Sequence, residues 1–481
     1  MAYEPVIGLE IHAQLKTSTK IFCGCSTAFE AEPNTHVCPV CLGLPGALPV
    51  LNRAAVDDGI RAALALGCAV QPSSIFARKN YFYPDLPKGY QISQYELPLA
   101  TDGVVEFENG DDVTRVGIVR VHLEEDAGKS LHEGFADSER KTYVDFNRSG
   151  VPLIEIVTRP DLRSATDAAK FFTHLRSILV WLGVTDGNME EGSLRCDANV
   201  SVRPAGSTTL GTKAEVKNLN SFRFLEKALE YEIERQIDVL EEGGRVVQET
   251  RLFDAASGHT VAMRSKEEAN DYRYFPDPDL PAVVVAPARV ARLLASMPEL
   301  PAGRRKRFID EYAIPAYDAA QLTQSRASGD YFERAVAAGA APKLASNWIM
   351  GELARKLKEL RVELAASPLT AERLAALLQL VEKGVVSQSI AKAVFEKMFE
   401  SDRSAEDIVA AEGLAQIDDE RQIDQLVADV LAKNMAAVEQ YRAGKAATFG
   451  YLVGQVIKAA NGKANPARVK VVLEKAISSR P

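Results

Sequence analysis

The sequence predicts an α+β fold: an antiparallel sheet within residues 1–292, a helical domain at 293–405 and a small helical tail domain at 406–481. The first part mixes short alternating strands with turns rich in Pro, Gly and Asn, and it shows few helical stretches, chiefly 166–182 and 221–241. From SMPELPAGRRKRF onward, apolar residues recur every three or four positions, which is typical of helices. The polar stretch ESDRSAED interrupts that pattern and separates the two helical domains.

Length and composition are those of an ordinary globular protein of several domains, with 481 residues, 46% of them hydrophobic and 26% charged. The start, MAYEPVIGLEIH, has neither the basic nor the apolar region of a signal peptide. No apolar run approaches the roughly 18 residues that span a bilayer. We therefore expect a cytoplasmic protein without membrane association, in which six cysteines are too few for a disulfide scaffold.

The C-terminal tail is basic, although the whole chain carries a formal charge of −9. An acidic average argues against a protein coated in nucleic acid, but it can conceal a local basic patch. From residue 440 onward the only acidic residue is Glu474, against eight basic ones: Arg442, Lys445, Lys458, Lys463, Arg468, Lys470, Lys475 and Arg480.

The predicted strand at residues 6–15, VIGLEIHAQL, alternates between an apolar face and a polar face. Glu10, His12 and Gln14 share the polar face, and two strand steps place Glu10 and His12 about 7 Å apart. A carboxylate and an imidazole in this arrangement could share a metal ion or a proton. An ordinary solvated face is the alternative.

Two later predicted strands repeat this mixture of acids, amides and bases. SLRCDANVSVR presents Arg195, Asp197 and Asn199 opposite an apolar face, and TKAEVKN presents Lys217 just before a predicted helix. Such faces favour a sheet that lines a polar cleft, with a solvated surface again as the alternative.

The densest acidic cluster lies in GIVRVHLEEDAGKS. Alternation places Glu124 and Asp126 on the face of His122, whereas Glu125 continues an apolar stripe. A carboxylate on such a stripe is costly unless it is paired or bound to a cation. Glu155 within PLIEIV raises the same question, and for Glu125 a strand end turned to solvent is the alternative.

Two common nucleotide-binding motifs are missing from the sequence. AGKS at 127–130 matches the end of a P-loop, but the first glycine of that motif would fall at Leu123, and no G-x-G-x-x-G follows a predicted strand. Oxygen ligands with an occasional histidine nevertheless suit Mg²⁺ bound to nucleotide phosphates, and Lys79, Arg195 and Lys217 could complete a phosphate site.

The loop RKNYFYPDLPKGYQ at 78–91 supplies Tyr81, Asp85 and Tyr90 close to these residues. Aromatic rings among basic side chains could stack an adenine or the unpaired end of an RNA. A loop whose rings only fill the core is the alternative.

Four cysteines are grouped in FCGCSTAFEAEPNTHVCPVC. Two short spacings separated by twelve residues are typical of a zinc knuckle with four thiolate ligands, here Cys23, Cys25, Cys38 and Cys41. Such a site is closed, so we expect a structural role. A redox couple is the weaker alternative because no βαβ pattern begins there, and the remaining two cysteines lie in apolar contexts.

Several long motifs together resemble the B subunits of the aspartyl/glutamyl-tRNA amidotransferases, the GatB/GatE family. They include VIGLEIHAQLKT, RKNYFYPDLPKGYQISQ, HLEEDAGKS, MEEGSLRCDANVSV, DYRYFPDPDLP, SNWIMGEL and LVGQVIKAANGKANP, and they extend over essentially the whole chain. The resemblance implies ATP-dependent conversion of Glu-tRNA(Gln) or Asp-tRNA(Asn) to Gln-tRNA(Gln) or Asn-tRNA(Asn). ATP would phosphorylate the side-chain carboxylate, and ammonia would then displace phosphate.

The resemblance also implies site residues. Mg²⁺ is expected at His12 and Glu125, with Glu10 close by. Motif membership and strand faces extend the predicted site. Three further residues are predicted to be catalytic: Lys79, Asp85 and Lys217. The residues predicted to bind substrate or ATP are Tyr81, Tyr90, Glu155, Arg195, Asp197 and Asn199.

A fold and partners are implied as well. The family fold is similar to the antiparallel catalytic cradle of glutamine synthetase and the guanidino kinases. The implied assembly is a heterotrimer with an ammonia-releasing amidase subunit and a small C subunit, and the helical part with its basic tail is expected to bind the tRNA body. Two alternatives stay open: a stand-alone ligase of the glutamine-synthetase type, against which the basic tail counts, and a tRNA-binding factor without catalysis.

Overall fold

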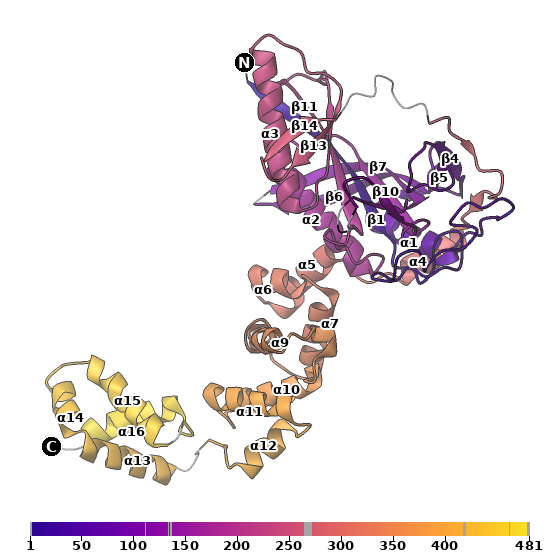
Figure 1. Cartoon of the computed structure of the whole chain (residues 1–481). Helices are drawn as coiled ribbons and strands as arrows, with labels where there is room; N and C mark the ends of the chain where they lie inside the picture. Colours follow the sequence, from indigo (N-terminus) through magenta and orange to yellow (C-terminus); the bar gives the residue numbers. More distant parts are fainter. Residues whose placement is uncertain are drawn as a thin grey trace. The chain divides into compact units, whose positions relative to one another are not determined.

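The computed structural model of the chain describes residues 2–110, 112–132, 134, 137–263, 272–416, 420–460 and 462–478 (Figure 1). It divides into two compact units, residues 1–300 and 301–481. Arg480, counted above in the basic tail, lies outside the described residues. Among the helices described, none combines the length and the apolar character needed to cross a lipid bilayer.

The first unit is built on a nine-stranded sheet in the order β14-β13-β12-β11-β1-β10-β7-β6-β2. All of its pairings are antiparallel except that of β12 with β13. The prediction of an α+β fold with a largely antiparallel sheet is therefore confirmed. The strands are β1 (Tyr3–Gln14), β2 (Ala69–Val70), β6 (Ala100–Asn109), β7 (Asp112–Glu125), β10 (Pro152–Thr158), β11 (Leu194–Pro204), β12 (Ala214–Lys217), β13 (Thr250–Asp254) and β14 (His259–Ala262).

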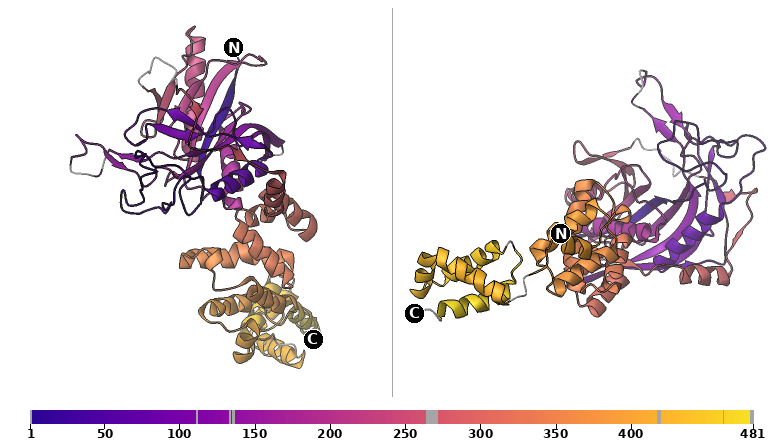
Figure 2. Two further views of the ribbon diagram at one scale, coloured as in Figure 1. Left: turned by 90° about the vertical axis from the view of Figure 1, so that its right-hand side faces the viewer. Right: turned by 90° about the horizontal axis from the view of Figure 1, so that it is seen from below.

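Helices cover one face of this sheet and bury its apolar side chains (Figures 1 and 2). Because side chains alternate along a strand, residues such as Ile11 on β1 and Ile156 on β10 join this core while their neighbours face the other way. Ser164 and Ser221 cap the two long helices at positions close to those predicted. The helices of this unit are α1 (Arg53–Ala65), α2 (Ala165–Leu182), α3 (Phe222–Glu241) and α4 (Pro287–Ala295).

Three smaller sheets complete the first unit. In one of them β4 pairs with both β5 and β15, which brings the loop at 78–91 beside residues 275–276. The strands are β4 (Ala77–Asn80), β5 (Tyr90–Ser93) and β15 (Phe275–Pro276), then β3 (Ser73–Ser74) with β16 (Val283–Val284), and β8 (Lys129–Leu131) with β9 (Tyr143–Asp145).

The second unit is helical, as predicted, and contains two separate hydrophobic clusters. One cluster runs from Phe308 to Val409, and the other runs from Ile423 to Ile477. The first cluster belongs to α5 (Pro301–Tyr312), α6 (Ala316–Leu322), α7 (Arg326–Ala337), α8 (Pro342–Trp348), the π-helical turn Ile349–Leu353, α9 (Ala354–Leu360), the 3₁₀ turn Leu364–Ala366, α10 (Ala371–Glu382), α11 (Gln388–Glu400) and α12 (Ala405–Ala411). The second belongs to α13 (Glu420–Lys433), α14 (Met435–Arg442), α15 (Ala447–Ala459) and α16 (Pro466–Ser478).

A buried ion pair network joins α3 to the β13–β14 hairpin. The Glu232 carboxylate is fully buried, accepts two hydrogen bonds from Arg235 at 2.9 and 2.6 Å, and lies 3.1 Å from Nε of Arg251 on β13. Burial raises the pKa of Glu232, but hydrogen bonds from Arg235, Gln236 and Thr260 outweigh it and lower the pKa below its ordinary range. The network therefore depends on an ionised Glu232.

We expect Glu232→Gln to lower the free energy of unfolding of the first unit by about 3–5 kcal/mol, because it leaves buried arginine charge uncompensated. A lowered pKa contributes stability above the ordinary value of about 4.3, and this stability is lost as pH falls through the lowered pKa. The difference in the free energy of unfolding between Glu232→Gln and the unsubstituted chain should thus become smaller at acid pH. Urea titrations followed by Trp181 fluorescence in a Trp348→Phe background measure this unit alone. Glu234→Gln, an exposed change on the same helix, is the control, and equal stabilities of the two variants would contradict the assignment.

Candidate active site

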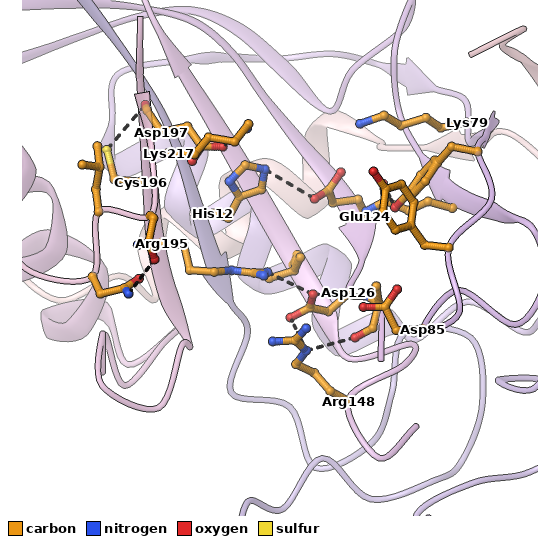
Figure 3. Close-up of a pocket in the computed structure, with 18 residues that line it drawn as sticks. His12, Lys79, Asp85, Glu124, Asp126, Arg148, Arg195, Cys196, Asp197 and Lys217 are labelled. Carbon is orange, nitrogen blue, oxygen red and sulfur yellow. Dashed lines mark hydrogen bonds and ion pairs between the residues drawn. The ribbon is translucent and has the colours of Figure 1, made fainter. Parts of the chain in front are cut away.

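The polar face of the nine-stranded sheet carries a cavity of about 650 Å³ (Figure 3). Strands β1, β7, β11 and β12 and the loop at 78–91 contribute its walls. Seven of the residues predicted for the site line this cavity: His12, Lys79, Tyr81, Asp85, Arg195, Asp197 and Lys217. The structure thus gathers side chains that are separated by up to about 200 positions in the sequence.

Strand register places a row of ionisable side chains beside the cavity, and His12 of this row lines it. His12 lies opposite Glu155 on β10, and Glu155 lies opposite His122 on β7. Nε2 of His12 is 3.3 Å from Glu155 Oε2 and 3.7 Å from Glu124 Oε1. His12, Glu124 and Glu155 each offer one ligand atom, and these atoms all lie within 4.8 Å of one another. The three residues therefore form a group that could hold a metal ion.

The carboxylates of this group favour positive charge on the neighbouring imidazoles. Burial lowers the pKa of His122, but Glu155 and then Glu124 outweigh that effect and raise it to about 9. The pKa of His12 is raised in the same way by its hydrogen bond with Glu155 and by the two carboxylates, against burial. Conversely, the two imidazoles hold the pKa of Glu155 well below its ordinary range although burial opposes them. Protons on the imidazoles or a divalent cation would satisfy the same buried carboxylates.

The sequence prediction differs from the structure at Glu125, whose carboxylate does not join His12. Neighbouring residues of a strand point to opposite faces, so Glu124 faces the cavity while Glu125 faces away from it. Glu125 accepts a hydrogen bond from Ile92 N at 2.9 Å and forms an ion pair with Lys88, and the two charged side chains are 3% and 7% exposed. A buried carboxylate was expected to need a cation, and for Glu125 the ammonium group of Lys88 supplies it.

Glu10 also lies outside the group of possible metal ligands formed by His12, Glu124 and Glu155 within the described part of the chain. Its carboxylate accepts a hydrogen bond from Asn199 Nδ2 at 3.0 Å. Next to it, Lys217 Nζ lies 2.5 Å from Asp197 Oδ2 and 2.9 Å from a Glu215 oxygen. Burial lowers the pKa of Lys217, but these two carboxylates outweigh it and raise the pKa above its ordinary range. Lys217 is thus a fixed positive charge at the cavity wall.

Tyrosine rings surround Lys79 on the opposite wall. Its Nζ lies 4.9 Å from the ring centroid of Tyr272 and 5.9 Å from that of Tyr81. Tyr90, predicted in the same site, instead stacks under the Arg78 guanidinium at 4.3 Å and lines a smaller cavity with Glu125. The aromatic loop therefore divides its residues between two cavities.

Gly128 allows the loop at 78–91 to lie close to the end of β7. Its amide donates to the Asp85 carbonyl at 2.8 Å, and a Cβ at this position would lie 2.9 Å from the same oxygen. The glycine of AGKS thus permits a close backbone approach beside the cavity, which agrees with the rejection of a P-loop.

Three charged residues that line the cavity were not among the predicted site residues. Glu124 and Asp126 share the polar face of His122, so alternation along β7 offered a signal for both. Arg148 lies in the turn before β10, and no pattern in the sequence distinguished it.

The four predicted cysteines come together beside the smaller cavity. One Sγ from each of Cys23, Cys25, Cys38 and Cys41 lies within 4.8 Å of all the others. A hydrogen bond with the Cys23 thiol lowers the pKa of Cys41 to about 4, although burial opposes it, so thiolate is favoured at that position. The set is a possible metal site whose donors suit zinc.

Comparison with known proteins is decisive for the family. Residues 5–291 match the family model described as the GatB/GatE catalytic domain, and residues 330–477 match the one described as the GatB domain. The chain belongs to the GatB/GatE family. The resemblance inferred from the motifs is thereby confirmed, and the catalytic-domain match contains the whole cavity described above.

Relatives within the GatB/GatE family are similar over their full length. The chain is 55% identical over 475 residues to the B subunit of the aspartyl/glutamyl-tRNA(Asn/Gln) amidotransferase of Geobacter sulfurreducens, with 99% of each chain covered. It is 54% identical over 478 residues to the protein of the same name from Geotalea uraniireducens, covering 99% of this chain and 100% of that one. The corresponding protein of Prosthecochloris aestuarii is 53% identical over 474 residues, with 98% of each covered.

We expect Glu124→Gln to weaken binding of Mn²⁺, a spectroscopic substitute for Mg²⁺, by about tenfold or more, because it removes a charged oxygen ligand next to His12. Electron paramagnetic resonance of free Mn²⁺ in a titration of the full chain measures the change. Glu125→Gln is the matched control on the neighbouring position and should leave Mn²⁺ affinity nearly unchanged. A larger loss in Glu125→Gln than in Glu124→Gln would refute the assignment to Glu124.

Zinc analysis of the purified chain should find about one ion per molecule, held by the four thiolates. Cys38→Ser should lose it, since three thiolates no longer close the tetrahedron. Cys68→Ala, which removes a buried cysteine outside the cluster, should retain it. Full zinc content in Cys38→Ser would show that the cluster is not the site.

Proposed function

We propose that this chain is the subunit that amidates Glu-tRNA(Gln), Asp-tRNA(Asn) or both, with ATP as phosphoryl donor and ammonia as nitrogen donor. The observation that carries the proposal is the group of His12, Glu124 and Glu155, of which His12 and Glu124 line a cavity that also presents lysines and arginines. Such a site suits phosphoryl transfer. The full-length similarity to relatives named as amidotransferase B subunits supports the choice of substrate.

The proposed reaction has two steps. An oxygen of the side-chain carboxylate attacks the γ-phosphorus of ATP, and the bond to the β,γ-bridging oxygen breaks with its electrons, which gives an acyl phosphate and ADP. The nitrogen of ammonia then attacks the acyl carbon, the bond from carbon to the phosphate oxygen breaks, and phosphate leaves with the electron pair. A base takes the proton that nitrogen loses. Activation is needed because a carboxylate cannot expel oxide at a useful rate.

His12, Glu124 and Glu155 would hold Mg²⁺, and the donor set of two carboxylates and one imidazole fits that ion. Mg²⁺ would supply charge neutralisation on the nucleotide phosphates. Lys79 would approach the nucleotide from the tyrosine wall, and Lys217, fixed by two carboxylates, would do so from the other side. Asp85, Tyr81, Arg195 and Asp197 line the same space and are proposed to contact substrate or ATP.

The four cysteines are proposed to hold a structural zinc ion. They supply all four ligands, so no position is left open for substrate. Buried Lys20 connects this segment to the catalytic unit, because its Nζ donates to the carbonyls of His36 at 2.7 Å and Phe146 at 3.3 Å. Zinc would thus order the long connection that follows β1.

The proposed partners are an amidase subunit that releases ammonia from glutamine, a small C subunit and the misacylated tRNA. The names of the relatives, which call them subunits, support an assembly. Residues 406–481 are proposed to bind the tRNA body through their basic residues. Because the reaction prepares aminoacyl-tRNA for translation, we place the chain in the cytoplasm.

The test supplies the purified complex with ATP, Mg²⁺, ammonium and either Glu-tRNA(Gln) or Asp-tRNA(Asn). We expect amidated aminoacyl-tRNA with ammonium alone, and ADP in equal amount. ADP formation that requires only a small carboxylic acid would instead indicate a stand-alone ligase. Binding of tRNA without ATP turnover would indicate a factor without catalysis. Either result would overturn the proposal.

A further inference from the structure

We propose that Arg148 and Arg195 form a two-guanidinium clamp that binds the phosphoryl group in transfer, and that Asp126 positions both arginines. The inference rests on the proposed function and names the subsite within it that takes the γ-phosphoryl group. Two guanidinium groups bound to one carboxylate leave a net positive charge at this wall of the cavity.

Asp126 is the fixed point of the clamp. Its side chain is 4% exposed, and its Oδ1 lies 3.0 Å from Nη2 of Arg195 while its Oδ2 lies 3.6 Å from Nε of Arg148 (Figure 3). Gln14 Nε2 donates to Oδ2 at 2.8 Å, and the amide of Ala127 donates to Oδ1 at 3.0 Å. A carboxylate held by four groups cannot rotate freely, so it sets the positions of both guanidinium groups.

Arg148 is additionally fixed by the backbone. Its Nε donates to the Ala127 carbonyl at 3.0 Å and its Nη2 to the Gly128 carbonyl at 2.6 Å. These bonds orient the planar guanidinium group and leave Nη1 without a protein acceptor among the described residues. Nε and Nη1 of Arg195 are likewise without an acceptor there. The side chains are 29% and 37% exposed and line the cavity, so donors remain for a ligand.

The chemistry of these donors points to a phosphoryl group. Guanidinium groups match phosphate oxygens in geometry and stay charged at all physiological pH values. The other two strong cations of the cavity are engaged differently: Lys217 is paired with two carboxylates, and Lys79 lies against tyrosine rings. The arginine wall therefore offers two oriented guanidinium groups to an additional anion.

The clamp is also placed correctly for the proposed reaction. Arg195 lies directly opposite His12 in the β1–β11 register, and Asp126 follows Glu124 by two positions in the chain. Cross-strand neighbours lie about 5 Å apart, and two strand steps cover about 7 Å. A phosphoryl group on the clamp would thus be adjacent to the group of His12, Glu124 and Glu155. That adjacency is needed if the nucleotide phosphates bridge a cation there and the arginines.

A purely structural role is the competing explanation, because Arg148 also ties the turn at 146–149 to residues 127–128. The two explanations differ in what they predict for an anion. A structural arginine affects folding, whereas a clamp arginine affects affinity for the phosphoryl group.

The probe is ADP with Mg²⁺, titrated calorimetrically into the complex in the presence and absence of beryllium fluoride, which mimics a γ-phosphoryl group. Beryllium fluoride should tighten ADP binding to the unsubstituted complex. Arg148→Gln and Arg195→Gln should each reduce that tightening about tenfold, which corresponds to one charge-assisted hydrogen bond, while binding of ADP alone changes little. Arg148→Lys should retain part of the tightening of ADP binding by beryllium fluoride. Asp126→Asn should lower kcat for amidation more than it raises KM for ATP, because the arginines remain but are no longer positioned.

Arg159→Gln is the control, since Arg159 pairs with Asp102 on the surface. Equal tightening by beryllium fluoride in Arg148→Gln and in Arg159→Gln would overturn the clamp. This readout needs neither tRNA nor ammonia. Failure of the proposed function would appear separately, as an unsubstituted complex that amidates no tRNA.

Discussion

Buried carboxylates that require positive charge organise the catalytic unit. Glu124 and Glu155 lie within reach of two imidazoles, Glu125 is satisfied by Lys88, and Asp126 by two arginines. Burying an ionised carboxylate without a partner costs several kcal/mol, so each of these residues dictates what surrounds it. The same requirement underlies the proposal that His12, Glu124 and Glu155 hold a divalent cation.

The antiparallel sheet brings these carboxylates and their cationic partners together in one site. Alternation along each strand sends apolar residues to the helix-covered core and polar residues to the open face. Register between strands then sets residues from distant segments side by side, as it does for His12, Glu155 and His122. A rigid sheet holds such groups more precisely than loops would, which suits catalysis by fixed charges. The loop at 78–91 and the turn at 146–149 add the cations that the strands do not supply.

Much of this arrangement could be predicted from the sequence. Period-two alternation indicated the shared polar face of Glu10, His12 and Gln14, and cysteine spacing indicated the cluster that the structure brings together. Alternation also placed Glu124 with His122, but the family resemblance directed the metal to Glu125, which the structure pairs with Lys88. Arg148 could not be found because its role depends on tertiary proximity to Asp126, and no local pattern encodes that proximity. Strand register, which brings Glu155 to His12, is likewise a property of the whole sheet.

In the proposed reaction the charged cavity transfers a phosphoryl group to the carboxylate carried by tRNA. This transfer can be tested by labelling both side-chain carboxylate oxygens of tRNA-bound glutamate with ¹⁸O and allowing the complex to amidate it with ATP and ammonium. Mass spectrometry of the inorganic phosphate then reports the path of the oxygen. Phosphoryl transfer to the carboxylate predicts one ¹⁸O atom in each phosphate released, because the carboxylate oxygen that attacks the γ-phosphorus leaves with it. Phosphate without ¹⁸O, formed together with amidated tRNA, would exclude the acyl phosphate.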